Sequence, residues 1–108
     1  MPYRVLLTQD AANDLEELDN WIATHDSPER ADYVLDRISE AFQKLTDLPE
    51  RGPHPKERSA LGIREFREVF FKPYRIIYRV ERRTIYIYLI ADGRRDMQTL
   101  LSRRLLNT

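Results

Sequence analysis

The chain has 108 residues, 42% of them apolar and 33% charged, and its 18 basic and 18 acidic side chains give a formal net charge of zero. This length suits one domain that buries a core without disulfides or metal ions, so we expect residues 1–108 to form a single domain. The chain contains no cysteine, which excludes thiol catalysis, thiolate metal sites and disulfide scaffolds.

Hydropathy and the N-terminal residues predict a cytoplasmic protein. No apolar stretch approaches the roughly 20 residues that a helix needs to cross a bilayer. The segment Met1–Arg4 leads into a strand-like run and lacks the pattern of a signal peptide. We therefore expect no interaction with a membrane.

The neutral total conceals two oppositely charged halves. Residues 1–50 hold 4 basic and 12 acidic side chains, a balance of −8, whereas residues 51–108 hold 14 basic and 6 acidic ones, a balance of +8. A surface of one sign attracts the opposite charge, so the basic half favours an anionic partner, either a nucleic acid or an acidic protein segment. The alternative is that the two halves neutralise each other across the fold.

A short strand and a helix are predicted first along the chain. Residues 3–7 are apolar and partly β-branched, which is typical of a strand. Thr8 is a good helix N-cap, with Asp10 in the first helical turn. From Asp10 to about His25 apolar residues recur at spacings of 4, 3 and 4, with acidic residues between them. This pattern predicts a helix with one buried and one acidic face.

A second helix follows after a short turn. Ser27 can cap it, Pro28 presets the backbone of its first turn, and Glu29 suits the positive end of a helix. Apolar residues repeat at spacings of 4 and 3 from Ala31 until Pro49 stops the pattern. The two helices are therefore expected to form an antiparallel hairpin.

A basic loop and a β-hairpin are predicted next. The loop spans residues 49–62, where prolines and glycines alternate with basic side chains. Residues 63–71 and 74–80 are rich in aromatic and branched side chains, and Lys72-Pro73 separates them. Proline lacks a backbone donor and suits a turn, so these two runs indicate a hairpin.

A third strand and a terminal helix complete the predicted elements. Residues 85–90 are apolar on both faces, which predicts a central strand. Asp92-Gly93 ends this run, and the leucines of residues 96–106 favour a short helix. We expect an α+β fold in which the helical hairpin packs on one face of a mostly antiparallel four-stranded sheet.

The second strand of the predicted hairpin has two different faces. Alternation places Tyr74, Ile76, Tyr78 and Val80 on one face and Arg75, Ile77 and Arg79 on the other. Arginine binds carboxylate or phosphate in a bidentate manner, so Arg75 and Arg79 favour a partner-binding face. The alternative is that they lie on the solvated side of a sheet.

Three aromatic residues could likewise either bind a partner or pack in the fold. Tyr86 and Tyr88 have side chains that can stack on RNA bases, but their place on a central strand favours the core. Trp21 is expected to pack at the tip of the helical hairpin. An exposed Trp21 would instead be an anchor for a partner.

Five sequence fragments carry a resemblance to a known group of proteins. In chain order they are Leu7-Thr8 with Ala11 and Asp14-Leu15, Ser27–Ala31, Pro49–Gly52, Tyr74–Val80 and Gly93–Asp96. Their order and spacing, with the predicted order of elements, resemble the RelE/ParE superfamily of type II toxin–antitoxin toxins over nearly the whole chain. Within that superfamily the fragments are most similar to the ParE branch.

The resemblance implies a toxin that inhibits DNA gyrase by binding and is held inactive by an acidic ParD-like antitoxin. That antitoxin would be of the ribbon-helix-helix type and would form a hetero-oligomer with the toxin, and no sequence-specific nucleic-acid binding is expected of the toxin itself. One alternative is a RelE-like enzyme that cleaves mRNA on the ribosome. Another is a non-toxic, antitoxin-binding module that acts only in autoregulation. Many relatives have a histidine directly before Gly93, where this chain has Asp92.

The sequence contains one candidate group of residues for RNA cleavage. RNA cleavage through the 2′-hydroxyl needs a general base, a general acid and cations. Arginine stays protonated, and of the two histidines only His54 lies in the basic loop, beside Lys56 and Arg58. His54 is either a base or an exposed loop residue between two prolines. We expect the second, and so predict no catalytic residue, no cofactor and no metal ion.

Five arginines are predicted to contact the target or the antitoxin: Arg67, Arg75, Arg79, Arg94 and Arg95. The last two follow the final strand, at a place that the fold should hold rigid. The alternative for them is an ion pair with Asp92 or Asp96 that ties down the tail.

Overall fold

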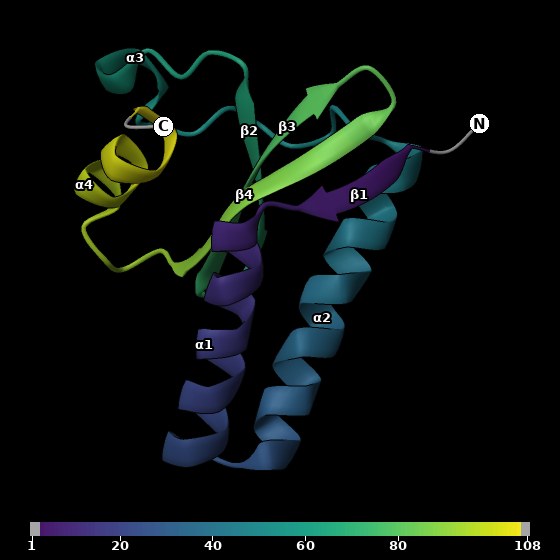
Figure 1. The fold of residues 1–108 in the computed structure, drawn as a ribbon, viewed down its shortest axis with the longest axis vertical. Helices are drawn as coiled ribbons and strands as arrows, with labels where there is room; N and C mark the ends of the chain where they lie inside the picture. The colour runs from purple at the N-terminus through teal and green to yellow at the C-terminus, as the bar shows by residue number, and fades with distance from the viewer. Residues whose placement is uncertain (1–2, 107–108) are drawn as a thin grey trace.

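A four-stranded sheet with helices on both faces forms the fold (Figure 1). The computed structural model describes residues 3–106. In chain order the elements are β1 (Arg4–Leu7), α1 (Gln9–His25), α2 (Pro28–Asp47), α3 (Arg58–Leu61), β2 (Phe66–Phe71), β3 (Tyr74–Glu81), β4 (Thr84–Asp92), α4 (Met97–Leu101) and the π-helical turn η1 (Ser102–Leu106). This architecture confirms the expected α+β class.

The sheet has the order β1-β4-β3-β2. β1 pairs with β4 in parallel, whereas β2 with β3 and β3 with β4 are antiparallel. β4 therefore lies inside the sheet, as its apolar sequence predicts. The register between β3 and β4 shifts by one residue, because Ile77 lies opposite Leu89 but Tyr78 lies opposite Ile87. Tyr88 is the extra residue of this β-bulge.

Both predicted helix caps are present. The Thr8 hydroxyl accepts a hydrogen bond from the amide of Ala11 at 3.1 Å, and the Ser27 hydroxyl accepts one from the amide of Arg30 at 3.0 Å. α1 and α2 run side by side, and the turn that joins them lies far from the sheet (Figure 1). No helix within residues 3–106 combines the length and the apolar character needed to cross a membrane.

Buried apolar side chains form two clusters, one on each face of the sheet. The cluster under α1 and α2 includes Ala11, Ile22, Ala31, Val34, Ile38, Leu45, Ile76, Tyr78, Ile85 and Ile87. The cluster under α4 consists of Ile63, Phe66, Ile77, Leu89, Ala91, Met97 and Leu101. The alternation predicted for β3 is thus confirmed. We call the face opposite α1 and α2, which carries Arg75 and Arg79, the arginine face.

Two predicted boundaries are corrected by the structure. The strand expected from residue 63 begins at Phe66. Gly62 has a left-handed φ of 70° that ends α3, and Ile63 is buried from this turn rather than from a strand. The predicted basic loop also contains the single turn of α3, because residues 58–61 form helical hydrogen bonds before Gly62.

Candidate functional site

Arg75 is buried between two carboxylates. Its Nη1 and Nη2 donate to the oxygens of Glu57 at 3.1 and 2.8 Å, and its Nε donates to Glu68 at 2.7 Å. Both glutamates are buried as well. This ion cluster ties the residue before α3 to β2 and β3. It corrects the expectation that Arg75 offers its guanidinium to a partner.

The ion cluster stays charged at neutral pH. Hydrogen bonds from Arg75 hold the pKa of Glu57 below its ordinary value, although burial acts in the opposite direction. The hydrogen bonds to Glu57, and then those to Glu68, raise the pKa of Arg75. Glu57 and Arg75 are therefore held as an ion pair, and Glu68 accepts a further hydrogen bond from the same guanidinium.

Arg79 stays accessible on the arginine face. Its guanidinium lies 5.8 Å from the ring centre of Phe66 and 5.4 Å from that of Tyr88, and it pairs with Glu81 at 2.9 Å. The Nε of Arg79 is buried and has no hydrogen-bond partner within residues 3–106, while the side chain as a whole is 32% exposed. Tyr88 packs against the cluster under α4 but is only half-buried. Arg79 therefore remains a candidate contact for an anionic group.

Arg67 anchors the basic loop. It lies opposite Tyr78, on the face that packs against α1 and α2. Its Nη1 donates to the carbonyl oxygens of Glu50 and Gly52 at 3.2 and 2.9 Å. The amide of Gly52 donates to the Tyr78 hydroxyl at 3.1 Å. The loop is thus fixed to β2 and β3 by contacts from both strands.

His54 is held against the edge of the sheet. Its Nδ1 lies 2.8 Å from the carbonyl oxygen of Phe66. A carbonyl oxygen can only accept, so Nδ1 carries the proton in this contact. Among the residues described, no hydrogen bond or ion pair joins His54 to Lys56 or Arg58. Nor does any group of three or more histidine, aspartate or glutamate side chains in that range suit a metal ion.

Arg94 and Arg95 lie in the loop that follows β4. The side chain of Arg94 is 79% exposed, and its Nε and Nη2 donate to the carboxylate of Asp92 at 2.9 and 2.5 Å. These bonds lower the pKa of Asp92. Arg95 is exposed, and its side chain forms no ion pair with any residue from 3 to 106. The predicted alternative, a pair with Asp92, therefore describes Arg94 but not Arg95.

A pocket of about 370 Å³ lies between α1 and this loop, lined by Trp21, Tyr74 and Arg95 among others. Trp21 is 59% exposed and stacks on His25 with ring centres 4.4 Å apart. The expectation that Trp21 packs into the hairpin tip is wrong. Its neighbour Ile22 holds the buried stripe position, so Trp21 points to the flank of the helix.

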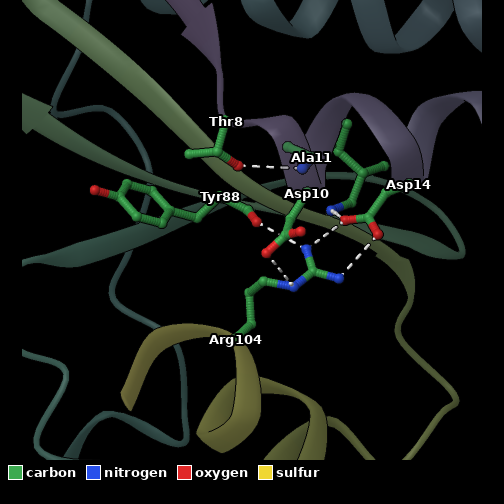
Figure 2. Close-up of polar contacts among 7 residues, drawn as sticks. Thr8, Asp10, Ala11, Asp14, Tyr88 and Arg104 are labelled. Carbon is green, nitrogen blue, oxygen red and sulfur yellow. Dashed lines mark hydrogen bonds and ion pairs between the residues drawn. The ribbon is translucent and has the colours of Figure 1, made fainter. Parts of the chain in front are cut away.

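An ion pair that the sequence did not reveal joins the two ends of the chain. Figure 2 shows Arg104 of η1 binding Asp14 of α1, with Nη1 and Nη2 at 2.8 and 3.0 Å from the two carboxylate oxygens. Arg104 also donates to the carbonyl oxygen of Tyr88 at 3.0 Å, and Asp14 accepts from the amide of Ile90 at 3.0 Å. These backbone groups belong to β4 beyond the end of β1. The ion pair thus forms the hydrogen bonds to β4 that a neighbouring strand would otherwise supply.

Comparison with known families decides the relationship. The family of ParE toxins of the type II toxin–antitoxin system parDE matches this chain over residues 5–97. That range begins in β1 and includes the loop with Arg94 and Arg95. The chain belongs to the ParE toxin family. The resemblance carried by the five sequence fragments is confirmed.

Individual proteins resemble this member of the ParE toxin family in sequence or in fold. Toxin ParE3 of Caulobacter vibrioides is 28% identical over 103 residues, which cover 94% of this chain and 97% of the relative. A chain of the chromosomal ParDE toxin–antitoxin system of P. aeruginosa has a TM-score of 0.70 at 20% identity, covering 83% of this chain and 95% of its own. A chain of the toxin–antitoxin complex RelBE2 of Mycobacterium tuberculosis has a TM-score of 0.60 at 24% identity, covering 85% and 99%. The two structures show a shared fold.

The departure at residue 92 has a structural consequence in this ParE family member. The carboxylate of Asp92 accepts from both the backbone amide and the side chain of Arg94. A histidine at this position would not offer two negatively charged oxygens to the guanidinium. Asp92 therefore orients Arg94 rather than supplying a proton carrier.

Proposed function

We propose that this ParE family toxin inhibits DNA gyrase by binding, without catalytic residues of its own. Membership in the ParE family over residues 5–97 is the observation that carries the proposal. The site supports it: Arg79, Arg94 and Arg95 are accessible cations, while His54 uses one ring nitrogen to hold the sheet edge. Accessible guanidinium groups without a nearby proton carrier suit binding better than proton transfer.

The proposal includes a partner that neutralises the toxin. We infer an acidic, ParD-like antitoxin of the ribbon-helix-helix type that forms a hetero-oligomer with the chain in the cytoplasm. The charge balance of +8 in residues 51–108 supports an acidic partner, since opposite charges steer association. The structural relatives include chains from a ParDE system and from a RelBE2 complex.

Two assays side by side test the gyrase proposal. We expect the purified chain to inhibit supercoiling by gyrase and to leave ribosome-bound mRNA intact. Site-specific cleavage of that mRNA, abolished by His54→Ala, would contradict the proposal and favour a RelE-like RNase. One observation favours the RNase alternative: on the arginine face, the guanidinium of Arg79 lies beside the half-buried ring of Tyr88.

Expression in a bacterial host tests the toxin and its partner. We expect growth arrest when the chain is expressed alone, and normal growth when the proposed ParD-like antitoxin is expressed with it. Normal growth in both cases would indicate instead a module that binds an antitoxin without toxicity.

A further inference from the structure

The pocket between α1 and the loop after β4, which we call the Trp21 pocket, has an aromatic wall on α1. His25 stacks on the Trp21 ring, and its Nδ1 donates to the Trp21 carbonyl oxygen at 2.9 Å. His25 follows one helical turn later, so it covers the ring face toward the C-terminus of α1 and holds the indole in place. Glu17 lies one turn earlier and also lines the pocket. The free ring face is therefore turned toward Glu17.

The loop after β4, which carries Arg95, is fixed to the sheet. The amide of Gly93 donates to the carbonyl oxygen of Pro73 at 2.8 Å, and the amide of Arg95 donates to the carbonyl oxygen of Asp92 at 3.1 Å. A Cβ atom at Gly93 would lie 2.9 Å from the Cδ of Arg75, so the loop packs closely against β3. Two walls with defined positions thus face each other across the pocket, one from α1 and one from this loop.

The Trp21 pocket offers one unpaired charge of each sign. Asp14 and Asp92 each pair with an arginine. In the part of the chain that the structure describes, no ion pair engages Glu17 or Arg95, and both side chains are exposed. Three acidic and two basic side chains line the pocket, a balance that disfavours a phosphate backbone. The charges therefore suit a protein segment that carries both signs.

We propose that the Trp21 pocket binds a loop of gyrase that carries one basic and one acidic side chain. An arginine of that loop lies along the free face of Trp21 with its guanidinium at Glu17, because guanidinium groups stack on indole rings and pair with carboxylates. A carboxylate of the same loop binds Arg95. Tryptophan and arginine are among the side chains that most often dominate binding between proteins. This inference rests on the proposed inhibition of gyrase.

A charge exchange tests both ends of the pocket without altering the net charge of the chain. In Glu17→Arg with Arg95→Glu, each end repels the group that it should attract. We expect the concentration that half-inhibits supercoiling by the gyrase holoenzyme to rise about tenfold or more. The matched control is Arg64→Glu with Glu65→Arg, the same exchange at two exposed residues outside the pocket. The control should inhibit like the unmodified chain, and an equal loss in the two variants would overturn the inference.

Variants at Trp21 test the stacking contact. Trp21→Ala should raise the half-inhibiting concentration about tenfold, and Trp21→Phe should raise it less, because a phenyl ring keeps part of the stacking surface. Tyr33→Ala removes an exposed aromatic side chain of α2 outside the pocket and should leave inhibition unchanged. The Trp21 variants should unfold at nearly the temperature of the unmodified chain, since the side chain is exposed. Unchanged inhibition by Trp21→Ala would contradict the proposal.

The pocket can also be observed directly, because Trp21 is the only tryptophan of the chain. Replacing it with 5-hydroxytryptophan gives a fluorophore that can be excited apart from the tryptophans of gyrase. We expect the gyrase holoenzyme to protect this fluorophore from quenching by acrylamide.

Three outcomes would overturn the inference and leave the proposed function standing. They are unchanged quenching in the presence of gyrase that the chain inhibits, equal protection by duplex DNA alone, and inhibition by the charge-exchange variant at the concentration of the unmodified chain. Lack of inhibition by the unmodified chain would instead overturn the proposed function, and the inference with it.

Discussion

Removal of the Arg75 guanidinium would leave Glu57 and Glu68 buried without a counter-charge. A buried ion pair that loses one member typically costs about 3–5 kcal/mol. We therefore expect Arg75→Ala to lower the free energy of unfolding by about that amount, measured by urea denaturation. Arg64→Ala, at an exposed cation, should change it by less than about 0.5 kcal/mol. Similar values for the two variants would contradict the structural role of Arg75.

The same cluster predicts how stability depends on pH. Arg75 holds the pKa of Glu57 below its ordinary value of 4.5, so the folded state binds the proton of Glu57 less readily than the unfolded state does. The resulting stabilisation is fully present above the ordinary value and is lost as the pH falls through the lowered pKa. We expect the difference in unfolding free energy between the unmodified chain and Glu57→Gln to be larger at pH 7 than at pH 3. A difference that does not change with pH would refute this linkage.

At the scale of elements, the pair of Asp14 and Arg104 holds the C-terminal helix to the sheet. Asp14→Asn keeps the shape of the side chain but removes its charge, and a charge-assisted bond contributes about 1.5–3 kcal/mol. We expect amide hydrogen exchange in residues 97–106 and at Ile90 to rise about tenfold or more. Asp10→Asn is the control, since the Asp10 carboxylate lies 3.7 Å from Arg104 and is largely exposed. Equal exchange in the two variants would contradict the assignment.

The elements themselves were largely predictable from local patterns. Thr8 and Ser27 cap helices because their hydroxyls reach nearby amides, and that geometry depends only on neighbours in the sequence. Burial of Arg75 was not predictable in this way. Alternation fixes the face on which a side chain lies, but not what covers that face. Glu57 is 18 residues away from Arg75 and reaches it only through the path of the basic loop.

Contacts between distant segments and a turn at Gly62 explain the other features that the sequence did not predict. Asp14 and Arg104 are 90 residues apart, and nothing in either local sequence indicates that they meet. Ile63 has the composition of a strand residue, yet it is buried from a turn because Gly62 redirects the chain. Local patterns therefore predicted the elements well and the polar contacts between them poorly.

At the scale of the whole molecule, the ion pairs described between the two charged halves within residues 3–106 involve few side chains. Between residues 3–50 and 51–106, ion pairs join Arg104 to Asp10 and Asp14, and Arg67 to Glu50 at 4.0 Å. The strong cluster around Arg75 lies within the second half. Much of the acidic helical surface and of the basic sheet surface therefore remains available to partners.

Arg94 and Arg95 allow binding of the target to be separated from folding. Both are exposed, and their only ion pair among residues 3–106 is the exposed one with Asp92. Such pairs add little stability. We expect Arg94→Ala with Arg95→Ala to retain its melting temperature and antitoxin binding while growth arrest is strongly reduced. Full growth arrest, or a drop of several degrees in melting temperature, would refute a role of these arginines in target binding.

The parallel pairing of β1 with β4 has a consequence during protein synthesis. Arg4 lies opposite Thr84, so β1 leaves the ribosome 80 residues before its neighbour in the sheet has been made. Contacts between such distant segments form late in folding, because a long loop must close first. A nascent chain that has not yet released β4 has no complete sheet. Arg104, which binds Asp14, is synthesised after β4. Interrupted translation should therefore yield fragments without toxicity, and a partner already present meets the toxin only once it is whole.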